Sequence, residues 1–151
     1  MRRKALPVMA GVAVAVAAVT IAVNIESEKP VALWTLPEGV KDFLEEHYAG
    51  EQPALAIRKF EDLKTEYELT FIDGTKLEFD AKGEWKEVKS HVRTVPEALV
   101  PPMIREYLDR NFPGVAVMEI SRDRKEFETG LSNRVELTFD SRTFLLTDFD
   151  D

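Results

Sequence analysis

The sequence contains one stretch twice, and this repeat limits the possible folds more than any other feature does. Residues 67–88 read YELTFIDGTKLEFDAKGEWKEV, and residues 127–148 read FETGLSNRVELTFDSRTFLLTD. With an offset of 60 positions, Leu77 corresponds to Leu137. Apolar and polar residues alternate in both copies, which is typical of strands with one buried and one solvated face. The repeat therefore predicts a strand–turn–strand unit that occurs twice.

The first unit, residues 35–91, is predicted to contain one helix followed by four antiparallel strands. Thr35 and Glu38 have the spacing of a capping box, which predicts that the helix starts there. Asp73-Gly74 predicts a type I′ turn, because both central residues of that turn need positive φ. The strands are expected at residues 54–60, 66–71, 75–80 and 85–89.

The second unit, residues 94–151, repeats this arrangement with one change at its start. Thr94 and Glu97 again have the spacing of a capping box, but Pro101-Pro102 interrupts any helix that begins there. We therefore expect the helix to begin at Val100-Pro101, 64 positions after its equivalent in the first unit.

Two turn glycines of the first unit are absent from the second. Arg134 stands at the position of Gly74, and Thr143 stands at the position of Gly83. Arginine and threonine adopt the left-handed conformation poorly, so these turns are expected to be looser or of another type.

The N-terminal segment, residues 1–25, resembles an export signal. Arg2, Arg3 and Lys4 precede a long apolar run. As a cleaved signal peptide it offers small residues before a cleavage site. As an uncleaved anchor, residues 5–25 would form about 30 Å of helix, enough to cross a bilayer. Both alternatives place the chain beyond Glu26 outside the cytoplasm, in the periplasm or cell envelope, or secreted if the signal is cleaved. Residues 26–34 are expected to be an extended linker.

The exported part is strongly acidic. Its 17 basic and 28 acidic residues give a net charge of −11, because three of the 20 basic residues precede the apolar run. Nucleic acid binding requires a basic surface, so no nucleic acid partner is expected. The chain has no cysteine, which excludes disulfides, a thiol nucleophile and thiolate metal sites.

No residue pattern in the sequence indicates catalysis, a cofactor or a metal site. His47 and His91 lie in different segments, and His47 is expected to be an ordinary boundary residue. Asp73, Asp80 and Asp140 lie beside predicted turns, but no D-x-D-x-D-G loop accompanies them. They are interpreted as turn-forming residues. Among the aromatic residues, Trp34 and Trp85 are the most notable, and Trp85 is expected to belong to the core.

Several motifs resemble those of the bacterial PepSY-like family, small exported proteins built from a tandem helix-plus-four-strand unit. They include FDAKGEWKEV at residues 79–88 and the series NFPG, RDR, LSN and ELTFD in residues 111–140. The resemblance implies an α+β fold in which two repeats form one curved, eight-stranded antiparallel sheet with the helices packed on one face. Such a shape looks like the beta-lactamase inhibitory protein, whose concave face grips a protein. The family has no established catalytic residues.

The polar face of the predicted sheet is the candidate binding surface. A broad face of mixed charge suits recognition of a protein better than small-molecule catalysis, which needs a deep apolar pocket. The residues expected on this face are Lys59, Glu68, Thr70, Lys76, Glu78, Glu119, Glu128, Gly130, Glu136 and Thr138. An ordinary solvated sheet face is the alternative interpretation.

The sequence thus predicts a non-enzymatic, exported binding module that recognises or inhibits an envelope or extracellular protein or peptide. The membrane would be contacted only through the N-terminal segment. A membrane-tethered structural or stress-related envelope protein without a specific ligand is the second hypothesis. A small hydrolase built on scattered carboxylates is the third.

Overall fold

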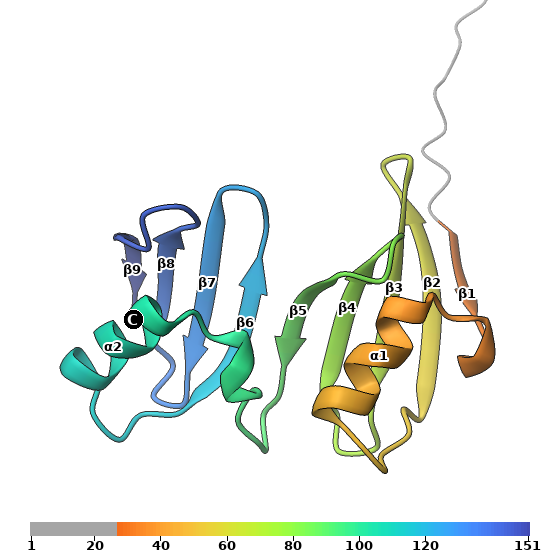
Figure 1. Cartoon of the computed structure of the whole chain (residues 1–151), viewed down its shortest axis with the longest axis horizontal. Helices are drawn as coiled ribbons and strands as arrows, with labels where there is room; N and C mark the ends of the chain where they lie inside the picture. The colour runs from red at the N-terminus through yellow and green to blue at the C-terminus, as the bar shows by residue number, and fades with distance from the viewer. Residues whose placement is uncertain (1–26) are drawn as a thin grey trace, which may run out of the picture.

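The computed structural model describes residues 27–151 and has an α+β fold with one open sheet of nine antiparallel strands (Figure 1). The strands are β1 (Ser27–Pro30), β2 (Leu55–Glu61), β3 (Lys64–Thr70), β4 (Lys76–Asp80), β5 (Trp85–Lys89), β6 (Val117–Arg122), β7 (Glu126–Leu131), β8 (Glu136–Asp140) and β9 (Leu146–Asp150). Each strand pairs with the next one in the chain. The predictions for residues 1–25 lie outside the described residues. Within the described part, no helix is long and apolar enough to cross a membrane.

The four strands predicted in the first unit are confirmed with shifts of one or two residues, and the last of them, β5, begins and ends where predicted. The expectation of eight strands was wrong. Residues 27–30, expected in a linker, form β1, which pairs with β2 from Ser27 opposite Phe60 to Pro30 opposite Ile57. Proline is tolerated there because β1 is an edge strand.

The two helices, α1 (Glu38–His47) and α2 (Pro102–Asn111), lie on the same side of the sheet (Figure 1). Each contacts the sheet through an aromatic pair. The rings of Phe43 and Phe79 lie edge to face at 5.1 Å, and those of Tyr107 and Phe139 at 5.4 Å. Phe79 and Phe139 are fully buried. Both helices therefore pack on the apolar face, and the polar face remains open.

Neither predicted capping box forms. Each helix begins after a proline, Pro37 or Pro101, and neither has a side-chain cap. The Thr35 hydroxyl donates instead to the carbonyl of Ala32 at 2.7 Å, within the short 3₁₀ turn η1 (Leu33–Thr35). Residues Glu97–Leu99 form a second 3₁₀ turn, η2. The helix expected to begin at Val100-Pro101 begins one residue later, at Pro102.

The turn at Asp73-Gly74 is not type I′, because only Gly74 has positive φ. The Gly74 amide donates to the Phe71 carbonyl at 3.0 Å, and the Phe71 amide donates to Thr75 at 2.8 Å. These contacts define a three-residue hairpin loop with one left-handed residue.

The equivalent turn of the second unit keeps this geometry without glycine. Arg134 adopts φ 74°, and its amide donates to the Leu131 carbonyl at 3.0 Å. The expectation of a looser turn was therefore wrong at this position. It is confirmed at the β8–β9 turn, where Phe144 has positive φ. The Phe144 amide donates to the Asp140 carbonyl, four residues back, whereas in the β4–β5 turn the Gly83 amide donates to the Asp80 carbonyl, three residues back.

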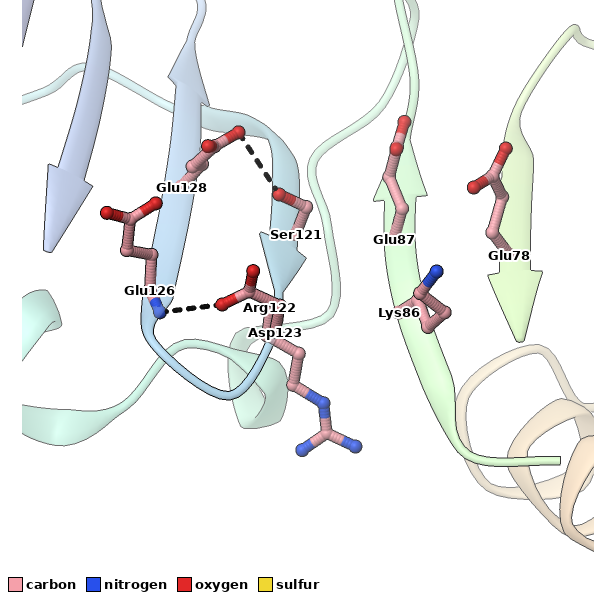
Figure 2. A pocket seen from close by; sticks show the side chains of 8 residues that line it. All are labelled: Glu78, Lys86, Glu87, Ser121, Arg122, Asp123, Glu126 and Glu128. Carbon is pink, nitrogen blue, oxygen red and sulfur yellow. Dashed lines mark hydrogen bonds between the residues drawn. The ribbon is translucent and has the colours of Figure 1, made fainter. Parts of the chain in front are cut away.

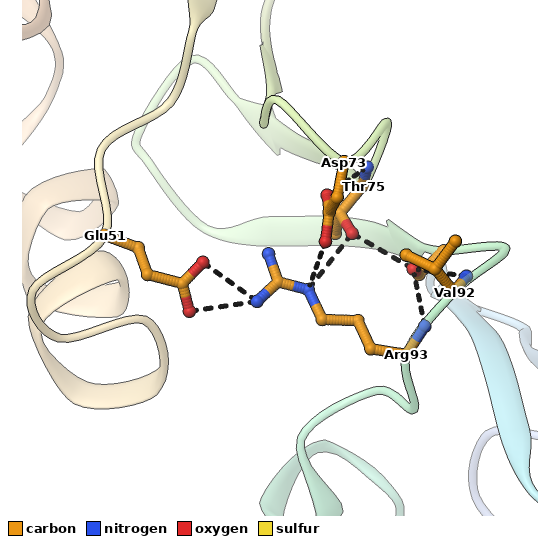
Figure 3. A network of polar contacts seen from close by, with 6 residues as sticks. Glu51, Asp73, Thr75, Val92 and Arg93 are labelled. Carbon is orange, nitrogen blue, oxygen red and sulfur yellow. Dashed lines mark hydrogen bonds and ion pairs between the residues drawn. The ribbon is translucent and has the colours of Figure 1, made fainter.

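A polar network around Arg93 ties the segment after β5 to the first half of the sheet (Figure 3). The Arg93 side chain contacts Glu51, Asp73 and Thr75. Thr75 and Ser90, both buried, share a hydrogen bond of 3.0 Å between their hydroxyls. This network reinforces the region around the β5–β6 pairing. The two strands pair there through three residue pairs.

Candidate functional site

The open face of the sheet is ordered in rows of residues that lie directly opposite one another on neighbouring strands. The central row consists of Pro30, Ile57, Glu68, Glu78, Glu87, Ser121, Glu128, Thr138 and Asp148. An adjacent row consists of Leu55, Thr70, Lys76, Lys89, Glu119, Gly130, Glu136 and Asp150. Residues opposite one another point to the same face of a sheet. The face predicted from the alternation is thus continuous across the sheet.

Every candidate residue of the sequence analysis lies on this face. Glu68, Glu78, Glu128 and Thr138 belong to the central row, and Thr70, Lys76, Glu119, Gly130 and Glu136 belong to the adjacent row. Lys59 lies opposite Glu66, one row further along.

On the β2–β4 side of the face, lysines neutralise the carboxylates. Lys59 Nζ donates to Glu68 and lies 3.8 Å from Glu78, while Lys76 Nζ lies 3.7 Å from Glu68. Burial raises the pKa of Glu68, but the hydrogen bond and charge of Lys59 outweigh burial and hold that pKa below its usual value. Glu68 is therefore an ionised, compensated carboxylate.

Glu87 differs from Glu68, and the sequence analysis did not single it out. It lies opposite Glu78 on one side and Ser121 on the other. Burial, followed by the charges of Glu78 and Glu119, raises its pKa. Within residues 27–151, Glu87 forms no ion pair shorter than 4.0 Å. The apolar residue Val88, next to Glu87 in an alternating strand, was the sequence signal that could have placed Glu87 on the open face.

A hollow of about 190 Å³ lies beside Glu87, where β5 and β6 separate (Figure 2). It is lined by Glu78, Lys86, Glu87, Ser121, Arg122, Asp123, Glu126 and Glu128. Figure 2 shows the carboxylates of Glu78, Glu87 and Glu128 on three of the four strands that border it. Ser121 Oγ donates to Glu128 at 3.4 Å.

Neither cation of the hollow neutralises these carboxylates. Arg122 points away from them (Figure 2), because its Nε donates to the Trp85 carbonyl at 3.0 Å and its guanidinium stacks on the Trp85 ring at 4.0 Å. Lys86 is paired with Glu66. The hollow is therefore acidic and suited to a positively charged group.

The remaining candidates have structural roles. The Asp73, Asp80 and Asp140 carboxylates each accept backbone amides of their turns, which confirms the interpretation as turn-forming residues. His47 packs edge to face on Phe43 at 4.6 Å, and His91 is exposed. Among the described residues, no group of three or more His, Cys, Asp or Glu side chains is arranged to hold a metal ion.

The two tryptophans lie in different surroundings. Trp85 is half-buried and packs against the core, as expected, and its ring also carries the Arg122 guanidinium. Trp34 is 81% exposed and lies in the 3₁₀ turn before α1. Neither ring lines the acidic hollow.

Comparison with solved structures finds close similarity to periplasmic proteins of Bacteroides. One, from Bacteroides thetaiotaomicron, is described as a "putative calcium-regulated periplasmic protein". It is 39% identical over 82% of this chain and 97% of its own, with a TM-score of 0.78. Another, from Bacteroides vulgatus, is described as a "putative periplasmic protein" of the DUF2874 family. It is 34% identical over 83% of this chain and 98% of its own, with a TM-score of 0.79.

A third solved structure, also a periplasmic protein from Bacteroides vulgatus, is of unknown function. It is 27% identical over 83% of this chain and 99% of its own, with a TM-score of 0.77. A search of the curated proteins finds no match. The similarity to periplasmic proteins supports an exported location, and nothing in the comparisons points to catalysis.

The family comparison matches residues 65–147 to the model described as "Putative beta-lactamase-inhibitor-like, PepSY-like". The matched region covers more than half of the chain and runs from β3 to β9. The chain belongs to the PepSY-like family.

Proposed function

We propose that the chain is a non-enzymatic, exported binding protein that recognises a protein or peptide on the open face of its sheet. The observation that supports the proposal best is the acidic central row, in which Glu68, Glu78 and Glu87 lie opposite one another on adjacent strands. Like charges directly opposite in a sheet destabilise the fold. A row of this kind suits a surface that gains its counter-charge from a partner.

The chemistry of the row indicates the kind of partner. Lysines compensate Glu68, whereas Glu87 and Glu128 border the hollow without a cation within 4.0 Å in the described part of the chain. A lysine or arginine side chain of a partner would fill the hollow and relieve the repulsion between the carboxylates. We therefore infer that the partner presents a basic segment to the sheet at the β5–β6 boundary.

The proposal includes a fold built from two tandem units with a curved sheet between them. The aromatic pairs Phe43–Phe79 and Tyr107–Phe139 support it, because their members are related by the offsets of 64 and 60 residues seen in the sequence. A curved, doubled sheet would present a face wide enough for a protein, as in the beta-lactamase inhibitory protein that the family resembles.

Calcium is a less suitable ligand for this face than a basic side chain. The Bacteroides thetaiotaomicron relative is described as calcium-regulated. Calcium takes six to eight oxygen ligands, and the described residues contain no group of three potential ligands that could hold a metal. The arrangement of oxygen ligands within residues 27–151 therefore favours recognition of a cationic partner over calcium coordination.

The test replaces the three carboxylates at the hollow with neutral isosteres, in the triple variant Glu78→Gln, Glu87→Gln and Glu128→Gln. Affinity-tagged chain is crosslinked in intact cells, and captured proteins are identified and quantified by mass spectrometry. Binding of each captured protein to purified chain is then measured directly. The triple variant should weaken binding of the partner at least about tenfold, as expected when buried or half-buried ion pairs are lost.

The matched control neutralises three exposed acids on the helix side, Glu45→Gln, Glu97→Gln and Glu106→Gln. It changes the net charge equally and should leave binding unchanged. If both triple variants bind the partner equally well, the open face is not the recognition surface.

A membrane-tethered envelope protein without a specific ligand is the second candidate. One observation favours the tether: β1 begins at Ser27, two residues after the apolar segment ends, so almost no linker separates the sheet from that segment. Mass spectrometry of the mature N-terminus tests it. An intact N-terminus together with no partner in crosslinking would support this candidate over the first.

A further inference from the structure

The start of β1 and four of the turns between neighbouring strands lie at the same end of the sheet. Antiparallel pairing places Ser27 at the same end as the turns at residues 62–63, 81–84, 123–125 and 141–145 (Figure 1). We call it the Ser27 end. The apolar segment of the sequence ends at Ile25, and two residues span at most about 7 Å. If that segment remains in a membrane, the Ser27 end faces the bilayer.

Two turns at this end meet around a second hollow. The Ser141 amide donates to the Lys125 carbonyl at 2.7 Å, and the Ser141 hydroxyl donates to the Arg124 carbonyl at 2.9 Å. These bonds join the β6–β7 turn to the β8–β9 turn. The hollow between them has a volume of about 450 Å³ and is lined by Arg124, Lys125, Glu126, Asp140, Arg142 and Thr147.

The hollow is basic in an otherwise acidic protein. Within residues 27–151, Arg124, Lys125 and Arg142 form no ion pair shorter than 4.0 Å. Glu126 and Asp140 lie beside them, which leaves a net charge of +1 at the hollow, against −11 for the exported part.

The carboxylate of Asp140 is already engaged by its own turn. Asp140 Oδ1 accepts the amides of Arg142 at 3.0 Å and Thr143 at 2.8 Å. It also accepts the Thr143 hydroxyl at 2.9 Å. Asp140 and Glu126 keep their charges, but no ion pair within residues 27–151 holds the three cations, so they can contact an external anion.

Exposed apolar side chains accompany the cations at the same end. Leu63, at the tip of the β2–β3 hairpin, is 89% exposed and adopts φ 62°, a conformation that disfavours leucine. Leu145, in the β8–β9 turn beside the basic hollow, is 66% exposed. Leu145 near these cations, and Leu63 several strands away at the same end, suit the interface of a bilayer, where anionic headgroups border apolar chains.

We propose that, in the uncleaved chain, the Ser27 end lies on the membrane surface and its basic hollow binds anionic lipid headgroups. The proposal rests on the tether described above and is independent of what binds the open face. Strand spacing places the hollow about 24 Å from β1 when measured along the sheet. Two contacts this far apart would fix the orientation of the sheet, with its strands along the membrane normal and its open face accessible from the side.

The test uses full-length chain, with its intact N-terminus verified by mass, in lipid nanodiscs. Because the chain has no cysteine, Leu145→Cys carries a single spin label beside the hollow, and Asp150→Cys carries one at the other end of the same strand. Contact with a nickel-chelating lipid is measured in phosphatidylcholine discs and in discs that also contain phosphatidylglycerol. The label at residue 145 should contact the lipid at least about fivefold more in the anionic discs, the factor expected for one cation–headgroup contact.

Charge reversal tests which residues bind the anionic headgroups. Arg124→Glu, Lys125→Glu and Arg142→Glu together should abolish the difference in lipid contact between the two kinds of disc. Lys41→Glu, Arg58→Glu and Arg105→Glu, with the same change in charge elsewhere, should preserve it. The variant Glu78→Gln, Glu87→Gln and Glu128→Gln should also preserve it, which separates this proposal from the proposed function.

Three results would overturn the proposal. The first is equal lipid contact at residue 145 in both kinds of disc, and the second is equal contact at residues 145 and 150. The third is loss of the difference when inorganic phosphate is added at constant ionic strength, because the hollow would then prefer free phosphate to lipid.

Discussion

Arg93 Nη1 donates to both carboxylate oxygens of Glu51, at 2.9 Å each, although the two residues are 42 positions apart in the chain. The same guanidinium lies 5.1 Å from the Tyr48 ring centroid and 5.2 Å from that of Phe71 (Figure 3 shows its polar contacts). Its Nε contacts Thr75 and Asp73, each at 3.1 Å. One side chain from the segment that leads to α2 is thereby held by two segments of the first half, residues 48–51 and 71–75.

Removal of Arg93 should destabilise the protein more than any other single change in this network. Arg93→Ala removes one of several partners of Asp73 and Thr75 and uncovers two aromatic rings, so we expect a loss of about 2–3 kcal/mol in the free energy of unfolding. Glu51→Gln, at a more exposed position, should cost less than about 1 kcal/mol. Urea denaturation measures both values. Equal losses in the two variants would show that the aromatic and Asp73 contacts of Arg93 contribute nothing.

Stability should fall at alkaline pH because of Tyr48. Burial, and the charges of Glu51 and Asp73 against the opposing charge of Arg93, raise the pKa of Tyr48 to about 12. In the unfolded chain Tyr48 releases its hydroxyl proton near pH 10. The stabilisation that the protonated Tyr48 gives the folded protein is therefore complete below pH 10 and is lost as the pH rises to 12. The loss should reach about 2 kcal/mol. In Tyr48→Phe, the difference in unfolding free energy between pH 9 and pH 11.5 should be smaller by that amount. An unchanged difference would contradict the assignment.

The contribution of Glu87 to stability should depend on pH in the opposite way to that of the compensated Glu68. Its raised pKa means that the folded protein favours the protonated form, so its stabilising effect is present in acid and is lost as the pH rises through the folded pKa. Glu87→Gln should therefore stabilise the protein by about 0.5 kcal/mol at pH 7 and have little effect at pH 4. Denaturation at both pH values measures this. Glu45→Gln, on the exposed side of α1, is the control and should show no such pH dependence.

Replacement of Arg134 by glycine should stabilise the β7–β8 turn. Arg134 adopts φ 74° where the first half has Gly74 at φ 84°. Since a left-handed conformation costs a non-glycine residue about 1 kcal/mol, Arg134→Gly should raise the unfolding free energy by that amount. The reverse change, Gly74→Ala, should lower it similarly. A destabilising Arg134→Gly would indicate that the arginine side chain has contacts worth more than the strain.

The sequence predicted the strands well because their alternation and their turn residues agreed. Trp85–Lys89 lies between a Lys-Gly turn and a polar loop, and its limits were read correctly. Strand β1 was missed because three polar residues followed by Pro30 carry no strand signal of their own. Their conformation comes from pairing with β2, which follows 24 residues after β1.

Other errors came from contacts that spacing does not encode. Thr35 has the spacing for a helix cap, yet its hydroxyl donates backwards to Ala32, because Pro37 already starts the helix with the required φ. The turn at Arg134 kept its geometry because the hydrogen bonds of the hairpin outweigh the preference of one residue. The candidate face was predictable from parity on β3, β4, β7 and β8, whereas bulges in β5, β6 and β9 shift the parity there. The uncompensated charge of Glu87 depends on which lysines reach which carboxylates.

The sequential strand order has a consequence for how the chain reaches its final form during export. Each strand of the sheet pairs with the next strand in the chain. A segment that has just left a translocation channel therefore finds its partner already present, and no strand waits for the C-terminus. Besides the outer edge of β1, a partly translocated chain would expose only the edge of its newest strand, which limits its chance to aggregate. The same topology lets the sheet form strand by strand from β1 to β9, in the order in which the strands would leave the cytoplasm.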